Sequence, residues 1–222
     1  MKRREFLTVP AKFLGGVLVY TLAGLPVRLA TAEGMVEVPL RFFTSAQAVT
    51  IAAACDRIFP SDQSGPGARE AGVVIYIDRQ LAGPYGHDRY RYTKGPFVES
   101  VPEHGYQGEP NPRDIYTEGV RQLGEDFAGL DGARQDERLR KMEGSMFFRM
   151  LRTHTIEGMF SDPMHGGNSG LIGWQLIGYP GPLMSYRDAI DQNYEEPFQT
   201  KKPVSLEQVL GYAVKGWEEE RG

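Results

Sequence analysis

The sequence contains a single cysteine, Cys55, among 222 residues. One cysteine excludes internal disulfides, an iron–sulfur cluster and the C-x-x-C-H pattern that attaches haem. Cys55 lies in the run TIAAACDRIFP, in which apolar residues recur at helical spacing. This pattern favours a small buried side chain over a covalent link to a second chain.

The chain also lacks an excess of positive charge. Its formal net charge at pH 7 is −4, although residues 1–32 carry five of the 25 Lys and Arg residues and only one acidic residue. Without residues 1–32 the net charge would be −8. A nucleic-acid partner requires a basic surface, so the charge argues against one.

Recognisable catalytic fingerprints are missing as well. The glycine-rich stretch HGGNSGLIG never completes the dinucleotide pattern G-x-G-x-x-G, and the sequence holds no phosphate-binding P-loop. Leu171 stands where a serine nucleophile elbow centred on Ser169 would require glycine. We therefore expect no catalytic residue and no cofactor on this chain.

No apolar run is long enough to cross a bilayer, which takes about 20 residues. The stretch Phe13–Leu25 follows a charged start and precedes the small-x-small sequence Ala30-Thr31-Ala32, so residues 1–32 are predicted to form an export signal. Arg3 and Arg4 indicate the twin-arginine type, which carries proteins already folded to the periplasm. The alternatives left open are a retained signal acting as a weak membrane tether, and an amphipathic helix of the fold.

Helical patterns dominate the remaining residues, 33–222, while strand signals are poor. Thr44 with Gln47 predicts a capping box that opens a helix ending at Phe59. We expect a mainly α fold, a single helical domain of about five to six helices with long irregular Gly/Pro-rich loops. The further helices are expected over about 68–81, from Asn111 with Pro112 at its first position, over the charged run DGARQDERLRKMEG, over 145–160, and from Ser205 to a stripe that includes Trp217.

The segment Gly83–Pro112 has no hydrophobic period, and its aromatic residues alternate with glycine, proline and charges. Structureless loops near this length are unusual inside a compact domain and are normally functional. We therefore interpret it as a candidate contact region.

The segment Ser161–Pro182, called here the Gly-rich segment, combines many glycines and prolines with large apolar side chains. Its composition argues against helix or strand. The free energy gained by burying its side chains is smaller than the conformational entropy cost of ordering its backbone. A second backbone must approach it closely, and we expect that backbone to belong to another protein; a fold back over the chain's own core is the alternative. The predicted docking residues are Asp162, Pro163, His165, Gly166, Gly167, Asn168, Gly173, Trp174, Tyr179 and Pro180, with Trp174 and Tyr179 as anchors.

A metal site is the competing hypothesis. His154 and Glu157 are three residues apart on a predicted helix, and Asp162 and His165 follow in the next loop. Histidine and carboxylate side chains at such spacing can hold one ion. This pattern would make the chain an independent exported metalloenzyme. The interpretation favoured over it makes His154 and Asp162 hydrogen-bonded structural residues, since Asp162 before Pro163 suits a turn that ends a helix.

Several runs resemble subunit 3, the small or γ subunit, of gluconate 2-dehydrogenase and related membrane-bound sugar dehydrogenases. The resemblance is carried by the twin-arginine start and by AAACDRIFPSD, LAGPYG followed by YRYTKGPF, and FFRMLRTHTIEGMFSDPMHGGNSGLIGWQLIGYPGP. It extends over nearly the whole chain after the signal.

The resemblance implies a non-catalytic accessory chain in a three-subunit periplasmic complex at the inner membrane. A large FAD-containing subunit would oxidise D-gluconate to 2-keto-D-gluconate, and a multihaem cytochrome c subunit would pass the electrons to ubiquinone. The small subunit would bind the flavoprotein and bring it across the membrane as a folded pair. The resemblance assigns no catalytic residue to this chain.

Overall fold

The computed structural model describes residues 27–31, 34–91, 94–97, 101–182 and 201–210. The predicted signal residues Arg3 and Arg4 lie outside the described residues, as does Trp217. No helix in the described ranges is long and apolar enough to cross a membrane.

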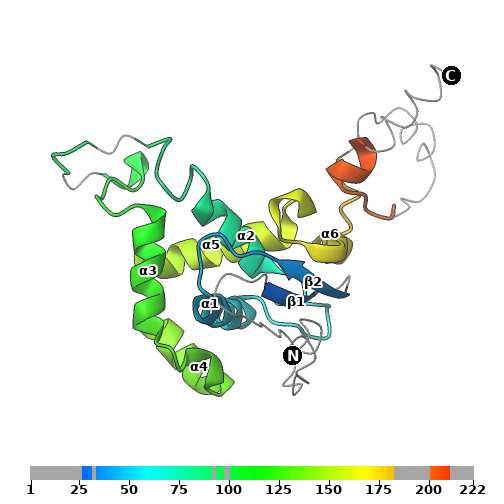
Figure 1. Cartoon of the computed structure of the whole chain (residues 1–222), viewed down its shortest axis with the longest axis horizontal. Helices are drawn as coiled ribbons and strands as arrows, with labels where there is room; N and C mark the ends of the chain where they lie inside the picture. Colours follow the sequence, from blue (N-terminus) through cyan, green and yellow to red (C-terminus); the bar gives the residue numbers. More distant parts are fainter. Residues whose placement is uncertain (1–26, 32–33, 92–93, 98–100, 183–200, 211–222) are drawn as a thin grey trace, which may run out of the picture.

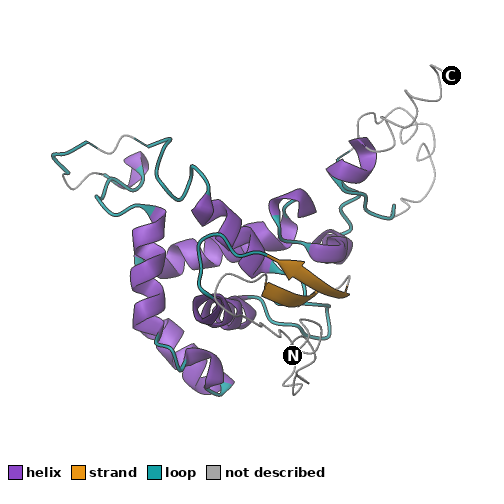
Figure 2. Ribbon diagram, in the orientation of Figure 1, coloured by secondary structure: helices purple, strands orange, loops and turns teal. Residues whose placement is uncertain are grey.

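The described chain is mainly helical, as the sequence predicts (Figures 1 and 2). Short 3-10 turns join several of the helices, and one antiparallel hairpin precedes them. The α-helices are α1 (Ser45–Ile58), α2 (Val73–Ala82), α3 (Pro112–Leu123), α4 (Gly132–Lys141), α5 (Met146–Phe160) and α6 (Ile172–Ile177), the 3-10 turns are Pro102–His104, Phe127–Gly129, Pro163–His165 and Ser169–Leu171, and the strands are β1 (Val27–Thr31) and β2 (Gly34–Val38).

The helix starts predicted at Thr44, Asn111 and Ser205 are confirmed by their caps. Thr44 Oγ1 accepts from Gln47 N at 3.3 Å while Gln47 Oε1 accepts from Thr44 N at 2.9 Å, which completes the capping box. Asn111 caps α3 ahead of Pro112, and Ser205 with Gln208 forms the same reciprocal pair before the helical residues 206–210.

The core is built around α5, which contacts α1, α2, α3 and α6. Its Leu151 is fully buried, as are Ile51 of α1 and Ile77 of α2. Cys55 is buried and its thiol is free. It accepts a 3.3 Å hydrogen bond from Thr155 Oγ1, and burial raises the pKa of the thiol to about 12. The prediction of Cys55 as a small packed side chain is therefore confirmed.

Two elements differ from the sequence-based expectation. Helix α2 begins at Val73 rather than near 68, because Gly72 adopts a left-handed conformation (φ 67°) that separates it from the hydrogen-bonded turns before it. The β1–β2 hairpin was not predicted, since five-residue strands are too short for alternation to stand out. Strand β1 covers residues at the end of the predicted signal segment.

The carboxylate of Asp78, on α2, fixes the chain that leads into α1. Its two oxygens accept hydrogen bonds from the backbone N–H groups of Arg41, Phe42 and Phe43 at 2.7, 3.0 and 2.8 Å. Asp78 is 1% exposed. Three backbone donors compensate a buried carboxylate that would otherwise be costly.

The loop between α2 and α3 is held partly by Arg91. Its guanidinium donates to the carbonyl of Gly108 at 2.7 Å, pairs with Asp88, and lies 5.0 Å from the ring centroid of Tyr106. The loop projects from one end of the molecule, and residues 201–210 lie at the other end (Figure 1). Tyr90 on this loop is largely exposed, and its role as a contact region stays a prediction.

Candidate functional site

The Gly-rich segment is ordered by two 3-10 turns and the six-residue helix α6. The expectation that its composition precludes a helix is therefore wrong. Two of the glycines end these short elements: Gly166 (φ 107°) follows the first turn and Gly178 (φ 67°) follows α6, both in left-handed conformations. Because each element is only three to six residues long, the glycines and prolines that would break a longer helix can lie between or at the edges of these elements.

Close backbone approach explains two further glycines. A Cβ added to Gly173 would lie 1.9 Å from the carbonyl oxygen of Met159, and one added to Gly167 would lie 2.1 Å from that of Gly158. Both carbonyls belong to the last turns of α5. The close second backbone that the composition predicts exists, and it is supplied by this chain.

Asn168 connects the start of the segment to α6. It is fully buried and left-handed (φ 49°), with Oδ1 accepting from Gly173 N at 2.8 Å and Nδ2 donating to Ser161 O at 2.9 Å. The next residue donates its N–H to the carbonyl of Ala71 at 3.0 Å. Asn168 therefore organises the fold of the segment and leaves no side-chain atoms for docking.

Trp174 is also inside the molecule. Its side chain is 4% exposed in the described structure, and its Nε1 donates to the carbonyl of Phe160 at 2.7 Å. The ring of Tyr179 packs edge-on against it, with centroids 5.0 Å apart. Trp174 thus anchors the segment to its own chain, which corrects the expectation that another protein holds it.

Asp162 has a structural role too. One carboxylate oxygen accepts from Met164 N at 3.0 Å and caps the following turn, and the other accepts from Leu206 N at 2.7 Å. This second bond ties the segment to the start of the helical residues 206–210. Sequence reasoning did not anticipate the link, because the two residues are 44 positions apart.

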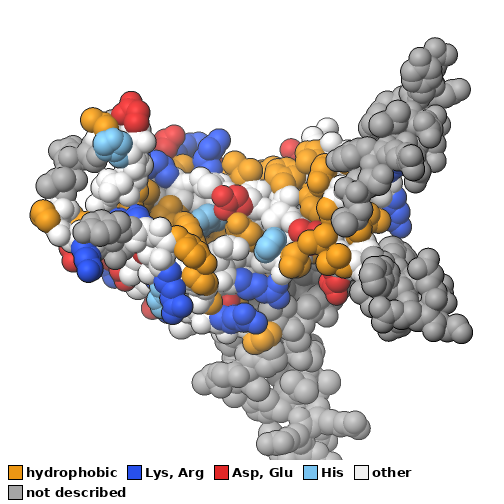
Figure 3. Space-filling model, turned by 90° about the horizontal axis from the view of Figure 1, so that it is seen from above, with side chains coloured by type: hydrophobic (Ala, Val, Ile, Leu, Met, Phe, Trp, Pro, Cys, Tyr) orange, Lys and Arg blue, Asp and Glu red, His pale blue; other side chains and the backbone are white. Residues whose placement is uncertain are grey.

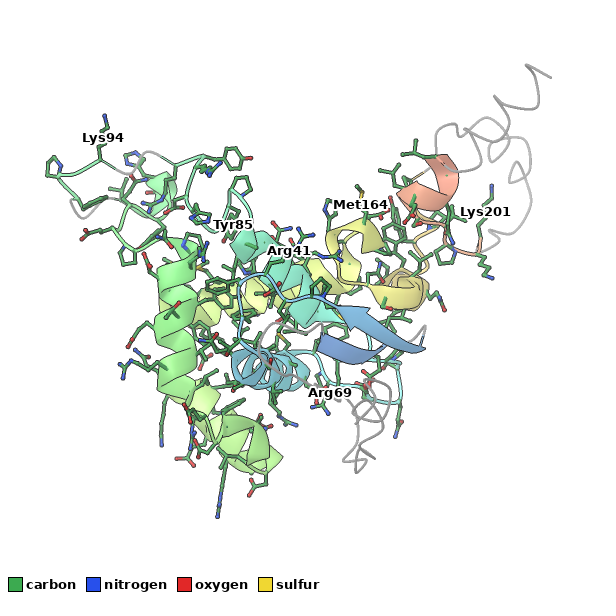
Figure 4. All side chains as sticks on the ribbon, viewed as in Figure 1. Arg41, Arg69, Tyr85, Lys94, Met164 and Lys201 are labelled. Atoms are coloured by element: carbon green, nitrogen blue, oxygen red, sulfur yellow. The ribbon has the colours of Figure 1, made fainter. Side chains whose placement is uncertain are left out.

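The segment and the helical residues 206–210 carry exposed apolar side chains. Exposed fractions are 54% for Met164, 57% for Ile177, 42% for Tyr179 and 48% for Leu210. We call these four residues the apolar rim; Tyr179 belongs to the predicted docking set, and the other three do not. Figure 3 shows hydrophobic side chains gathered toward this end, and Figure 4 shows Met164 on the same upper side as Tyr85.

Of the other predicted docking residues, His165 is exposed beside Met164, and Pro163, Gly166 and Pro180 are partly exposed. Gly167 and Gly173 are buried. Only the exposed members can meet a partner without unfolding the segment. Docking through them stays a prediction.

The alternative metal site at His154, Glu157, Asp162 and His165 is not formed in the described part of the chain. No group of three His, Cys, Asp or Glu side chains among the described residues is arranged to hold an ion. Both ring nitrogens of His154 are hydrogen-bonded to tyrosines, Asp162 caps backbone groups, and His165 lies on the surface. His154 and Glu157 do lie one turn apart on α5. Asp162 and His165 in the following loop do not join them, because Asp162 binds backbone N–H groups and His165 is exposed.

His154 instead lies at the centre of a polar network beneath an open cavity. Its Nδ1 is 2.8 Å from the hydroxyl of Tyr116, and its Nε2 is 3.0 Å from that of Tyr85. Burial lowers the pKa of His154 to about 4, so the ring is neutral at pH 7. Next to it, Tyr76 donates its hydroxyl to Glu157 Oε2 at 2.9 Å.

The cavity has a volume of about 430 Å³. It opens beside α2 and α5, and Figure 4 shows Tyr85 where α2 ends. Burial raises the pKa of Tyr85 to about 12, with Glu157 and Asp88 adding to the shift, so this hydroxyl keeps its proton. The lining residues are Tyr76, Gln80, Tyr85, Met146, Arg149, Met150, Thr153, His154 and Glu157.

Comparison with known families gives one assignment. Residues 45–181, more than half of the chain, match the family model described as gluconate 2-dehydrogenase subunit 3. The chain belongs to this family. The matched range begins with α1 and ends with the Gly-rich segment, so it includes both the apolar rim up to Tyr179 and the cavity. Searches of curated proteins and of solved structures give no match.

Proposed function

We propose that this chain is the non-catalytic small subunit of a periplasmic gluconate 2-dehydrogenase complex associated with the inner membrane. It binds the large FAD-containing subunit and supports its folding and twin-arginine export. FAD and haem c reside on the flavoprotein and on a cytochrome c subunit, which together transfer electrons from D-gluconate to ubiquinone. Membership of the subunit 3 family is the observation that carries this proposal.

The apolar rim supports the docking part of the proposal. Four of the large hydrophobic side chains exposed in the described structure lie on the Gly-rich segment or on the helical residues tied to it by Asp162. Exposed apolar side chains gathered at one end of a molecule mark a contact site for another protein. The segment beneath it is fixed by buried hydrogen bonds, so the rim is preorganised and loses little entropy on binding.

Co-purification of the flavoprotein with the full chain tests this docking surface. Replacing Met164 and Ile177 together by Lys should lower the yield of bound flavoprotein about tenfold or more, because the charges would be desolvated at the contact. Ala133→Lys, at an exposed position on α4, adds the same kind of charge elsewhere and should change nothing. An unchanged yield in the Met164/Ile177 variant would refute docking through the rim.

Export is tested separately. Replacing Arg3 and Arg4 by Lys should leave the flavoprotein in the cytoplasm, since the pair would no longer be recognised by the twin-arginine route. Normal dehydrogenase activity in the periplasm of that strain would refute the escort role while leaving the docking role to the co-purification test.

A further inference from the structure

The cavity beside His154 has a chemistry that the docking role does not use. Tyr116 is fully buried, and the only hydrogen-bond partner of its hydroxyl among the described residues is Nδ1 of His154. A buried hydroxyl hydrogen needs an acceptor, so Tyr116 donates to Nδ1. A neutral His154 accepting at Nδ1 carries its proton on Nε2.

This tautomer fixes the role of Tyr85. The Nε2–H group of His154 donates to the Tyr85 hydroxyl oxygen across 3.0 Å. The hydrogen of the Tyr85 hydroxyl then has no acceptor among the described residues, and Tyr85 is part of the cavity lining. The cavity wall therefore presents an O–H donor whose position is set by a buried network.

An acceptor lies on the same wall. Glu157 uses one carboxylate oxygen for the Tyr76 hydroxyl, and its second oxygen has no partner in the described part of the chain. A donor and a carboxylate acceptor on one wall complement a ligand hydroxyl, which accepts from Tyr85 through its oxygen and donates its hydrogen to Glu157.

The cavity lining also contains a cationic side chain, Arg149. Arg149, Thr153 and Glu157 are spaced one turn apart on α5, so the charge of the lining changes from positive to negative over about 12 Å. Arg149 forms no ion pair with any described residue, and a guanidinium binds a carboxylate through two parallel N–H donors. Met146 and Met150 add apolar surface to the same lining.

We propose that this cavity binds a small carboxylic acid that carries hydroxyl groups. Its carboxylate pairs with Arg149, a hydroxyl bridges Tyr85 and Glu157, and its carbon chain lies along the methionines. The volume of about 430 Å³ lies in the range of small-molecule sites. This binding requires neither the flavoprotein nor the apolar rim.

Titration of the purified full chain by calorimetry or ligand-observed NMR tests the site with three matched sets of probes. Threonate and gluconate carry both groups, threitol and sorbitol lack the carboxylate, and butyrate and hexanoate lack the hydroxyls. The hydroxylated acids should bind saturably and about fivefold or more tightly than either other set, as one lost hydrogen bond costs about that factor. Absence of saturation at about 10 mM, or equal affinity for all three sets, would overturn the proposal.

Variants then assign the contacts. Tyr85→Phe should weaken binding of the hydroxylated acids about fivefold, and Arg149→Met about tenfold while removing the preference over polyols. Arg152→Met is the matched control, because this exposed α5 residue does not line the cavity. Unchanged affinity in Tyr85→Phe or Arg149→Met chains, with unfolding midpoints equal to wild type, would refute the assignment.

Failure of this proposal and failure of the docking proposal are distinguishable. Tyr85→Phe and Arg149→Met chains should co-purify the flavoprotein at wild-type yield. Loss of the flavoprotein from either variant would place the cavity in the subunit contact and overturn its role as a separate ligand site.

Discussion

The indole Nε1 of Trp174 donates a 2.7 Å hydrogen bond to the carbonyl of Phe160, the last residue of α5. This bond fastens the Gly-rich segment to the helix that precedes it and satisfies a carbonyl at the helix end that has no partner within the helix. Because the indole is buried by its own chain, its removal acts on stability before it acts on assembly.

Trp174→Ala should destabilise the isolated chain by about 3 to 5 kcal/mol, the usual cost of removing a large buried aromatic side chain. Chemical denaturation of the wild-type and Trp174→Ala chains measures this difference in the free energy of unfolding. Tyr179→Ala at the rim is the comparison, with an expected loss of about 1 kcal/mol because that ring is already 42% exposed. Equal stability of Trp174→Ala and wild type would contradict the observed packing.

Gly173→Ala should unfold the segment, because the added methyl would lie 1.9 Å from a backbone oxygen that no side-chain rotation can clear. The expected loss is about 3 kcal/mol or more, as for severe overpacking. Gly144→Ala provides the control, since nothing lies within 4 Å of the Cβ that it would add. Thermal unfolding of both variants checks the prediction, which would fail if their midpoints were the same.

Asp78→Asn should destabilise the chain by about 2 to 3 kcal/mol. The amide keeps the shape of the carboxylate but has one acceptor oxygen, so it loses charge-assisted bonds to the N–H groups of Arg41, Phe42 and Phe43. The exposed Glu143→Gln substitution removes the same charge without a comparable network. Hydrogen exchange at residues 41–43 would report the loss directly, and unchanged protection there would count against the role of Asp78.

His154 should make stability depend on pH below about 6.5. Its pKa is lowered by burial to about 4 in the folded chain, against 6.5 when unfolded. The unfolded chain therefore binds a proton first, and the stabilisation present above pH 6.5 is lost as pH falls toward 4, by about 3 kcal/mol. Comparing wild type with His154→Gln across this range separates the histidine from the carboxylates. Parallel stability curves would show that the ring is not buried in its neutral form.

Local signals in the sequence predicted most of the helical architecture. Capping residues such as Thr44 and Asn111 act within three positions, so their effect is readable without the fold. The start of α2 was misplaced because an ordinary Ala-Gly pair gives no sign that Gly72 adopts a left-handed conformation. The hairpin was missed for lack of strand length.

The candidate site was less predictable, because its geometry depends on contacts between distant residues. The composition of the Gly-rich segment correctly required a second backbone, but only the fold identifies the backbone as α5. The sequence favoured a hydrogen-bonded structural role for His154 over a metal ligand, but its tyrosine partners come from positions 38 and 69 residues away and could not be identified. Exposure of Met164 and Ile177 likewise follows from tertiary packing.

The backbone of Gly173 packs so closely against the carbonyl oxygen of Met159 that no side-chain atom fits between the Gly-rich segment and α5. Two such backbone contacts, together with the Trp174 bond, make the segment a rigid extension of the helix that bears Glu157 and His154. A displacement of the apolar rim would therefore be transmitted through α5 to the cavity beside His154.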